Sequence, residues 1–118
     1  ILCSGKIYFD LLDAREKYKR RDVVLLRIEQ LYPFPAKSLV KSIKPYAKNA
    51  EFIWCQEEPK NMGAWSHVRD YIQWTLDFIK ANNKNVSYIG RAPAASPATG
   101  YAKRHVAQQK EILEKVFN

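Results

Sequence analysis

The sequence has little of several residue types that mark well-known functional sites. Its 118 residues include four glycines, two cysteines and two histidines. The glycines form neither the Gly-x-Gly-x-x-Gly pattern of dinucleotide sites nor the Gly-x-x-x-x-Gly-Lys-Ser/Thr pattern of P-loops. The cysteines lack the Cys-x-x-Cys spacing of zinc sites and redox pairs. The common sequence signatures of nucleotide, zinc and dithiol chemistry are therefore excluded.

Long hydrophobic segments are also missing. No apolar run approaches the ~20 residues that a membrane-spanning helix needs, and no signal peptide is visible. We therefore predict no membrane partner. Cys3 and Cys55 lie in short apolar runs, where free cysteines behave as small buried hydrophobic residues, which favours a reducing compartment.

Positive charge, by contrast, is in excess, with 20 Lys and Arg against 12 Asp and Glu, a formal net charge of +8. Such a balance can indicate a nucleic-acid partner. The basic residues are spread along the chain, and their densest run, residues 15–21, ends a predicted helix, where cations complement the helix dipole. We therefore expect no nucleic-acid partner; an acidic partner subunit remains an alternative.

The chain alternates four times between strand-like and helix-like segments. The predicted strands are apolar runs at residues 1–3, 23–28, 52–55 and 86–89. The predicted helices, with apolar residues at helical spacing, run over residues 4–20, 35–47, 64–81 and 101–117. This alternation predicts a three-layer α/β/α fold with a mostly parallel sheet, in a single domain over residues 1–118.

Several residues are assigned structural roles by the same patterns. Ser4 is the expected N-cap of the first helix, and Pro45 is expected to shorten the second. Trp54, Trp65 and Trp74 are expected to fill the core, with Trp65 the most interface-prone of the three because it follows a polar loop. His67 and His105 are interpreted as ordinary surface or interface residues.

Two polar loops, residues 56–63 and 90–100, follow the third and fourth predicted strands. Open α/β sheets bind ligands at the carboxyl ends of their strands, so these loops are the candidate site. Neighbouring Glu57 and Glu58 should point in opposite directions, which does not suit a paired acid/base site. We expect that one of them, with Gln56 and Asn61, faces another domain; the alternative is a solvated carboxylate beside a capping or ion-paired one.

Arg91 begins the second loop and has two interpretations. Its planar guanidinium could hold a phosphate or carboxylate, or it could be an ordinary surface group. Ser96 and Thr99 precede the last helix, where capping is favoured over anion binding.

Four segments together resemble one enzyme family. They are residues 2–8 (LCSGKIY), 27–35 (RIEQLYPFP), 54–61 (WCQEEPKN) and 90–100 (GRAPAASPATG). They are similar to the C-terminal domain of the thiamine-diphosphate-dependent 2-oxoglutarate dehydrogenase component, in the family's order and over nearly the whole chain. The resemblance implies a transketolase C-terminal-domain-like fold. Because the chain opens within a predicted strand, we expect a C-terminal fragment of a longer multidomain enzyme.

The resemblance also implies the activity and partners of the parent enzyme. Enzymes of this family decarboxylate 2-oxoglutarate on thiamine diphosphate held by magnesium, and they transfer the succinyl group to a lipoyl arm in the tricarboxylic acid cycle. They are homodimers in a complex with dihydrolipoyl succinyltransferase and dihydrolipoyl dehydrogenase, in the bacterial cytoplasm or the mitochondrial matrix. The family's Gly-Asp-Gly thiamine motif does not occur in this sequence. We therefore expect no catalytic residue, cofactor or metal in this chain, and no activity from it alone.

Two hypotheses for the role of the chain remain open. The first is a structural domain that supports the dimer and packs on the remaining domains of its polypeptide. By resemblance it would also contribute to a regulatory site for a nucleotide or acyl-coenzyme A, with Ser4, Gly5, Lys6 and Arg91 as candidates. The second is an autonomous α/β module that binds an anion or small molecule. An interface domain should expose an apolar patch of several hundred Å², whereas an autonomous module should not.

Overall fold

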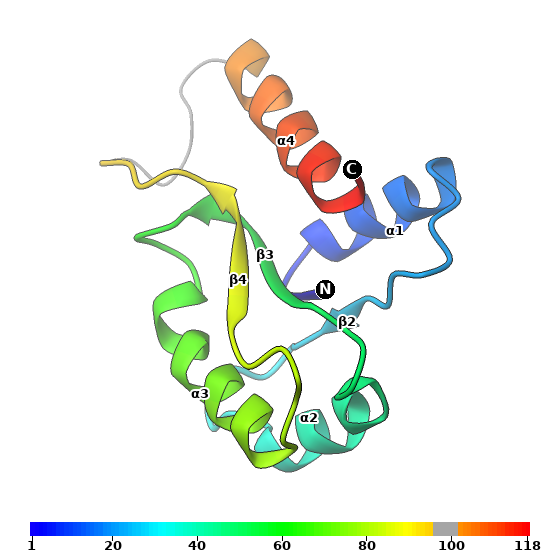
Figure 1. Ribbon diagram of the computed structural model, residues 1–118. Coiled ribbons are helices and arrows are strands. Elements are labelled where there is room, and N and C mark those ends of the chain that lie inside the picture. Colours follow the sequence, from blue (N-terminus) through cyan, green and yellow to red (C-terminus); the bar gives the residue numbers. More distant parts are fainter. Residues whose placement is uncertain (96–101) are drawn as a thin grey trace.

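The computed structural model describes residues 1–95 and 102–118, in which strands and helices alternate (Figure 1). The strands are β1 (Leu2–Cys3), β2 (Leu26–Arg27), β3 (Phe52–Pro59) and β4 (Val86–Arg91). The α-helices are α1 (Ile7–Lys17), α2 (Ala36–Ile43), α3 (Trp65–Phe78) and α4 (Ala102–Phe117), and the 3-10 helix η1 (Lys44–Tyr46) follows α2. None of these helices is long and apolar enough to cross a membrane.

The four strands form one sheet in the order β2-β1-β3-β4, and every neighbouring pair is parallel. Helices cover both faces, with α2 and α3 on one side and α1 and α4 on the other (Figure 1). The predicted α/β/α fold with a parallel sheet is therefore confirmed. Because the chain runs from β1 outward to β2 and then back past β1 to β3, the strand order reverses between β1 and β3.

The hydrophobic core consists of two clusters, one on each face of the sheet. Successive strand residues point to opposite faces, so Leu2 and Trp54 enter the cluster under α2 and α3. Their neighbours Cys3 and Cys55 enter the cluster under α1 and α4. Both thiols are fully buried, as predicted, and the loss of hydration raises the pKa of Cys3 to about 11 and that of Cys55 to about 12.

The strand predictions were wrong at two places. Of the run 23–28, only Leu26–Arg27 forms a strand, because β2 lies at the edge and pairs with the short β1 alone. Val24 is accordingly 38% exposed instead of covered on both faces. Conversely, β3 continues past Cys55 to Pro59 because β4 pairs alongside it, with a register shift between these two residues. Part of the expected polar loop is therefore strand.

Three smaller expectations also need correction. Lys6, and not Ser4, is the N-cap of α1, and no side-chain cap bond forms, because Gly5 turns the chain with φ +82°. Trp74 is 54% exposed and lies outside the core, whereas Trp65 is buried and packs against Tyr88. The expected effect of Pro45 is confirmed, since α2 ends at Ile43 and a 3-10 turn takes over.

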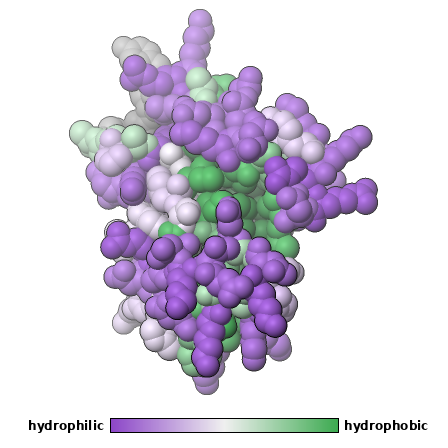
Figure 2. Space-filling view, in the orientation of Figure 1, coloured by the Kyte–Doolittle hydropathy of each residue, from purple (hydrophilic) through white to green (hydrophobic). Residues whose placement is uncertain are grey.

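Pockets lie at both edges of the sheet. At the amino edge, a pocket of about 550 Å³ is lined largely by segments that precede the strands, including Ile1, Val23, Val24 and Glu51. Figure 2 shows hydrophobic residues gathered in the middle of the visible face, between hydrophilic regions. The described residues of the two polar loops that the sequence singled out, 56–63 and 90–95, lie at the carboxyl edge instead (Figure 1).

Candidate functional site at the carboxyl edge of the sheet

A pocket of about 480 Å³ lies at the carboxyl edge, where the strand order reverses. Open α/β sheets bind their ligands at this position. Loops after three strands contribute to it: Ser4 and Gly5 follow β1, Leu31 and Tyr32 follow β2, and Gly63 and Ala64 follow β3. Trp54, Gln56, Glu58 and His67 complete the lining.

Gln56 holds the connection between β3 and α3 from inside. Its side-chain Oε1 accepts hydrogen bonds from Trp54 Nε1 (2.9 Å) and from the Trp65 backbone N–H (3.0 Å). Its Nε2 donates to the carbonyl oxygens of Met62 (2.9 Å), Pro59 (3.0 Å) and Glu58 (3.2 Å). The residue is 2% exposed, so it offers almost no surface to a partner in this structure. Its evident role is to shape the loop, which the sequence alone did not reveal.

Glu57 and Glu58 point to opposite faces of β3. The Glu57 side chain is 16% exposed, and its Oε1 lies 3.4 Å from Nζ of Lys6, at the start of α1. Glu58 is exposed and lies against Gly63, near the start of α3. The prediction that these adjacent carboxylates point apart, and therefore do not form an acid/base pair, is confirmed. One is neutralised by a lysine, and the other lines the pocket.

Arg91 ties β4 to α4. Its Nε donates to Oε1 of Gln108 (3.1 Å), and its Nη2 donates to Oε1 of Gln109 (3.1 Å). Its Nη1 donates to the backbone carbonyl of Glu57. An anion would have to compete with these bonds for the guanidinium. The prediction of an anion clamp at Arg91 therefore stays a prediction, and the observed contacts are structural.

The Arg91 contacts also extend to His105 on α4. The Nη2 of Arg91 lies 3.3 Å from Nδ1 of His105. From α4 the network continues to α1, because Gln109 Nε2 donates to Oδ2 of Asp10 (3.0 Å). The Arg91 guanidinium thus joins β4 to β3 and α4, and Gln109 extends the network to α1.

Asn61 connects the two polar loops. Its side-chain Nδ2 donates to the carbonyl of Ala94 (2.9 Å), and its Oδ1 accepts from the Ala94 N–H (3.0 Å). The Tyr88 hydroxyl lies 2.8 Å from the carbonyl oxygen of Arg91 in its own strand and 3.3 Å from that of Glu58 in β3. Burial raises the pKa of Tyr88, which keeps this hydroxyl protonated. Ser96, the remaining candidate, lies outside the described residues.

Sequence reasoning missed part of the pocket. The loop after β2 contributes Leu31, whose carbonyl lies 2.7 Å from Nε2 of His67, and Tyr32, which is 82% exposed. A signal was present, because this loop also follows a predicted strand. Within residues 1–95 and 102–118, no group of three or more His, Cys, Asp or Glu residues is arranged to hold a metal ion.

Comparisons with known proteins agree with this architecture. The chain matches the family described as 2-oxoglutarate dehydrogenase C-terminal over residues 1–117. It is 54% identical over 114 residues to the 2-oxoglutarate dehydrogenase E1 components of Brucella anthropi and Brucella ovis. These alignments cover 97% of this chain but only 11% of each relative's length. The chain therefore belongs to the 2-oxoglutarate dehydrogenase C-terminal family.

Proposed function

We propose that this chain is the C-terminal structural and interface domain of a 2-oxoglutarate dehydrogenase E1 component. The observation that carries the proposal is the 54% identity over nearly the whole chain to proteins of that name. Such an enzyme oxidatively decarboxylates 2-oxoglutarate in the tricarboxylic acid cycle. Its succinyl product passes to a lipoyl arm in a complex with dihydrolipoyl succinyltransferase and dihydrolipoyl dehydrogenase. We propose a homodimer, located in the cytoplasm if the source is bacterial.

Thiamine diphosphate and magnesium supply the decarboxylation chemistry in such an enzyme, but the described part of this chain does not fit them. The Gly-Asp-Gly motif by which this family holds the diphosphate does not occur in the sequence. No cluster of potential metal ligands occurs among residues 1–95 and 102–118. We therefore assign both groups to the remaining nine-tenths of the polypeptide.

The contacts of this chain support a scaffolding role within that enzyme. The side chains of Gln56 and Arg91 form their hydrogen bonds with loops and helices of this same domain. A rigid carboxyl edge would present the same surface to neighbouring domains in every catalytic cycle, because Gln56 and Asn61 hold the loops after β3 and β4 by more than one bond each.

The direct test compares the full-length polypeptide that carries this chain with the chain alone. With thiamine diphosphate and magnesium present, we expect the full-length protein to reduce an artificial electron acceptor when 2-oxoglutarate is added, and the chain alone to be inactive. Pyruvate and 2-oxoisovalerate serve as control substrates. A full-length protein that prefers either control substrate would refute the proposed function, and so would activity in the isolated chain.

A regulatory site for a nucleotide or acyl-coenzyme A is a second candidate function. If this chain alone binds such a ligand, it is the autonomous α/β module of the second hypothesis. The favouring observation is the 480 Å³ pocket at the strand-order reversal, with Lys6, 78% exposed, in the turn beside it. Thermal unfolding of the chain with AMP, acetyl-coenzyme A or thiamine diphosphate tests it, since a ligand of the folded state raises the melting temperature. A saturable shift with AMP or acetyl-coenzyme A that Lys6→Ala weakens would support the site. No shift would rule out a self-sufficient site.

A further inference from the structure

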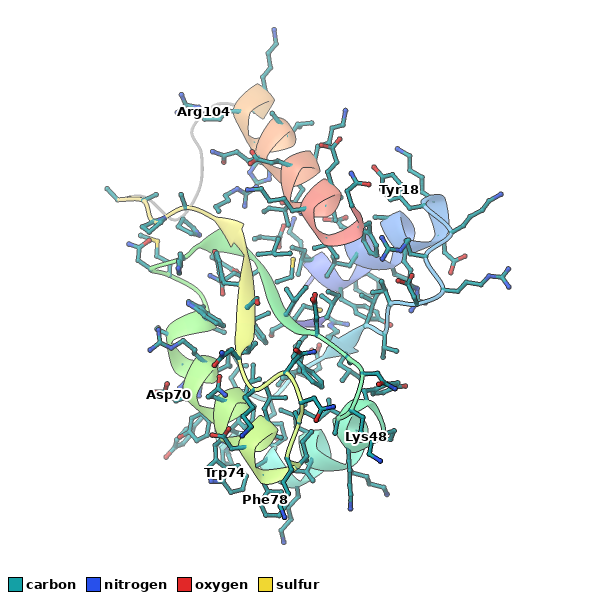
Figure 3. All side chains as sticks on the ribbon, in the orientation of Figure 1. Tyr18, Lys48, Asp70, Trp74, Phe78 and Arg104 are labelled. Carbon is teal, nitrogen blue, oxygen red and sulfur yellow. The ribbon has the colours of Figure 1, made fainter. Side chains whose placement is uncertain are left out.

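An exposed aromatic stripe runs along the side of α3 that does not face the sheet. We call Tyr71, Trp74 and Phe78 the aromatic seam; they are 44%, 54% and 62% exposed. Figure 3 shows Trp74 and Phe78 at the rim of the molecule, pointing away from the sheet. The helix does not need these rings for its own packing, because a separate face carrying Val68, Ile72 and Leu76 is fully buried.

The seam is preorganised. The rings of Trp74 and Phe78 are stacked, with centroids 5.2 Å apart, and Tyr71 is stacked on Phe34 at 4.9 Å. Mutual stacking restricts the side-chain rotamers before any partner arrives, so less entropy is lost on binding. The three residues are spaced by three and four positions, which is the spacing that packs one helix against another.

The charges beside the seam define its partner further. Asp70, whose side chain is 87% exposed and lies 3.7 Å from Nε of the also exposed Arg69, and exposed Asp77 flank the seam seven residues apart. This pair forms a negative border on a chain whose net charge is +8. A complementary surface would be apolar along its centre, with Lys or Arg residues repeating at the same seven-residue interval on one side.

We propose that the aromatic seam docks against an apolar, basic-flanked helix from the remainder of the same polypeptide. The inference rests on the proposed function, because it needs a longer polypeptide around this chain. The relatives are about nine times as long as this chain. The seam exposes roughly 300 Å², taking about half of each aromatic side chain, which is well below the ~800 Å² per partner of a stable two-protein interface. A tethered segment needs no such area, because tethering gives it a high effective concentration.

A second copy of this chain fits the seam less well. In an antiparallel two-fold pair, each flank of the helix meets the same flank of the other copy. Asp70 and Asp77 would then face carboxylates of like charge, which disfavours the pair. The area and the charge pattern therefore both favour a segment of the same polypeptide.

Cysteine labelling tests the proposal directly. Phe78→Cys and Trp74→Cys place a thiol on the seam, and Arg69→Cys is the control, since Arg69 is 61% exposed on a different side of α3. Native Cys3 and Cys55 are fully buried, so they give little background. Labelling with N-ethylmaleimide is followed peptide by peptide by mass spectrometry, in the chain alone and in the full-length protein.

We expect the seam thiols to label at least about tenfold more slowly in the full-length protein than in the chain alone, because labelling then requires the contact to open. The Arg69→Cys rate should change little. Equal seam rates in both proteins, or equal slowing of seam and control, would overturn the proposal. Seam labelling in the chain alone that slows as its concentration rises would identify a second copy as the occupant and overturn it too.

The same full-length samples are assayed with 2-oxoglutarate, which separates the two proposals. An active enzyme with an unprotected seam would refute the docking surface alone. A protected seam in a protein that does not use 2-oxoglutarate would refute the proposed function while retaining the docking surface.

Discussion

Replacing Gln56 by leucine should destabilise the chain strongly. The substitution keeps a side chain of similar size but removes the acceptor for Trp54 Nε1–H and for the Trp65 backbone N–H, both of which are buried. A buried donor without a partner costs about 1–3 kcal/mol, so two donors together cost about 2–6 kcal/mol. Two of the three carbonyl oxygens that lose Nε2, those of Glu58 and Met62, lie partly at the surface, where water replaces part of the bond, whereas that of Pro59 is buried.

The expected loss is about 3–4 kcal/mol, within the 5–15 kcal/mol that is typical of a whole domain. At about 4 °C per kcal/mol for a domain of this size, the melting temperature should fall by about 12–16 °C. Urea denaturation followed by circular dichroism measures the free energy of unfolding. Gln30→Leu is the matched control, since Gln30 is exposed and makes one side-chain bond, so its change should stay within about 0.5 kcal/mol.

A double-mutant cycle then identifies the cause. Trp54→Phe removes the indole N–H that Gln56→Leu leaves without a partner. The double variant should therefore be more stable than the sum of the single changes predicts, by about 1–3 kcal/mol. Additive effects, or a loss below about 1 kcal/mol for Gln56→Leu alone, would refute the reasoning that this amide holds the β3–α3 connection.

Three further predictions concern the turns, the thiols and α4. Gly63→Ala should destabilise the chain in urea denaturation more than Gly5→Ala: both have positive φ, at a cost of about 1–2 kcal/mol, but only at Gly63 would the new Cβ meet atoms 3.0 Å away. Cys3 and Cys55 should resist a thiol reagent at pH 8 until the chain unfolds, and rapid labelling of the folded protein would contradict their burial. Because burial raises both pKa values, the free energy of unfolding should fall as the pH rises above the unfolded thiol pKa of 9.0 toward about 11. Arg91→Met should speed amide hydrogen exchange in α4 while leaving α3 unchanged, because it removes the bonds to Gln108 and Gln109; unchanged exchange in α4 would argue against the structural role of Arg91.

The exposed aromatic seam also bears on the two hypotheses for the chain. A patch of roughly 300 Å² is no larger than the largest patch of a typical monomer, so the seam does not meet the size expected of an interface domain. Its stacked geometry, and not its area, is the feature that favours the interface hypothesis over an autonomous module. The seam was not predicted, because Trp74 was expected to lie in the core: three consecutive turns of α3 carry apolar residues on two adjacent faces, and spacing alone does not say which face meets the sheet.

The sequence by itself determined the fold class and the family of this protein. Alternating apolar runs and helical periodicities leave few arrangements other than a parallel sheet between helices, because each apolar face must be buried. The four motifs resemble one family, and the match over residues 1–117 confirmed that family. These are properties of local pattern, which a single chain displays residue by residue.

Only the tertiary structure decided what the polar loop residues do. The sequence treated Gln56 and Arg91 as candidates for contact with partners or anions, but their bonds go to groups up to 34 residues away in the chain. The order β2-β1-β3-β4 brings Ser4, Glu58 and Gly63 to one pocket, and it also places β2 at an edge, where its strand is cut short. The physical reason is that a polar side chain forms hydrogen bonds with the groups that the packed helices and strands bring within about 3 Å of it. The separation of two residues in the sequence does not determine that distance.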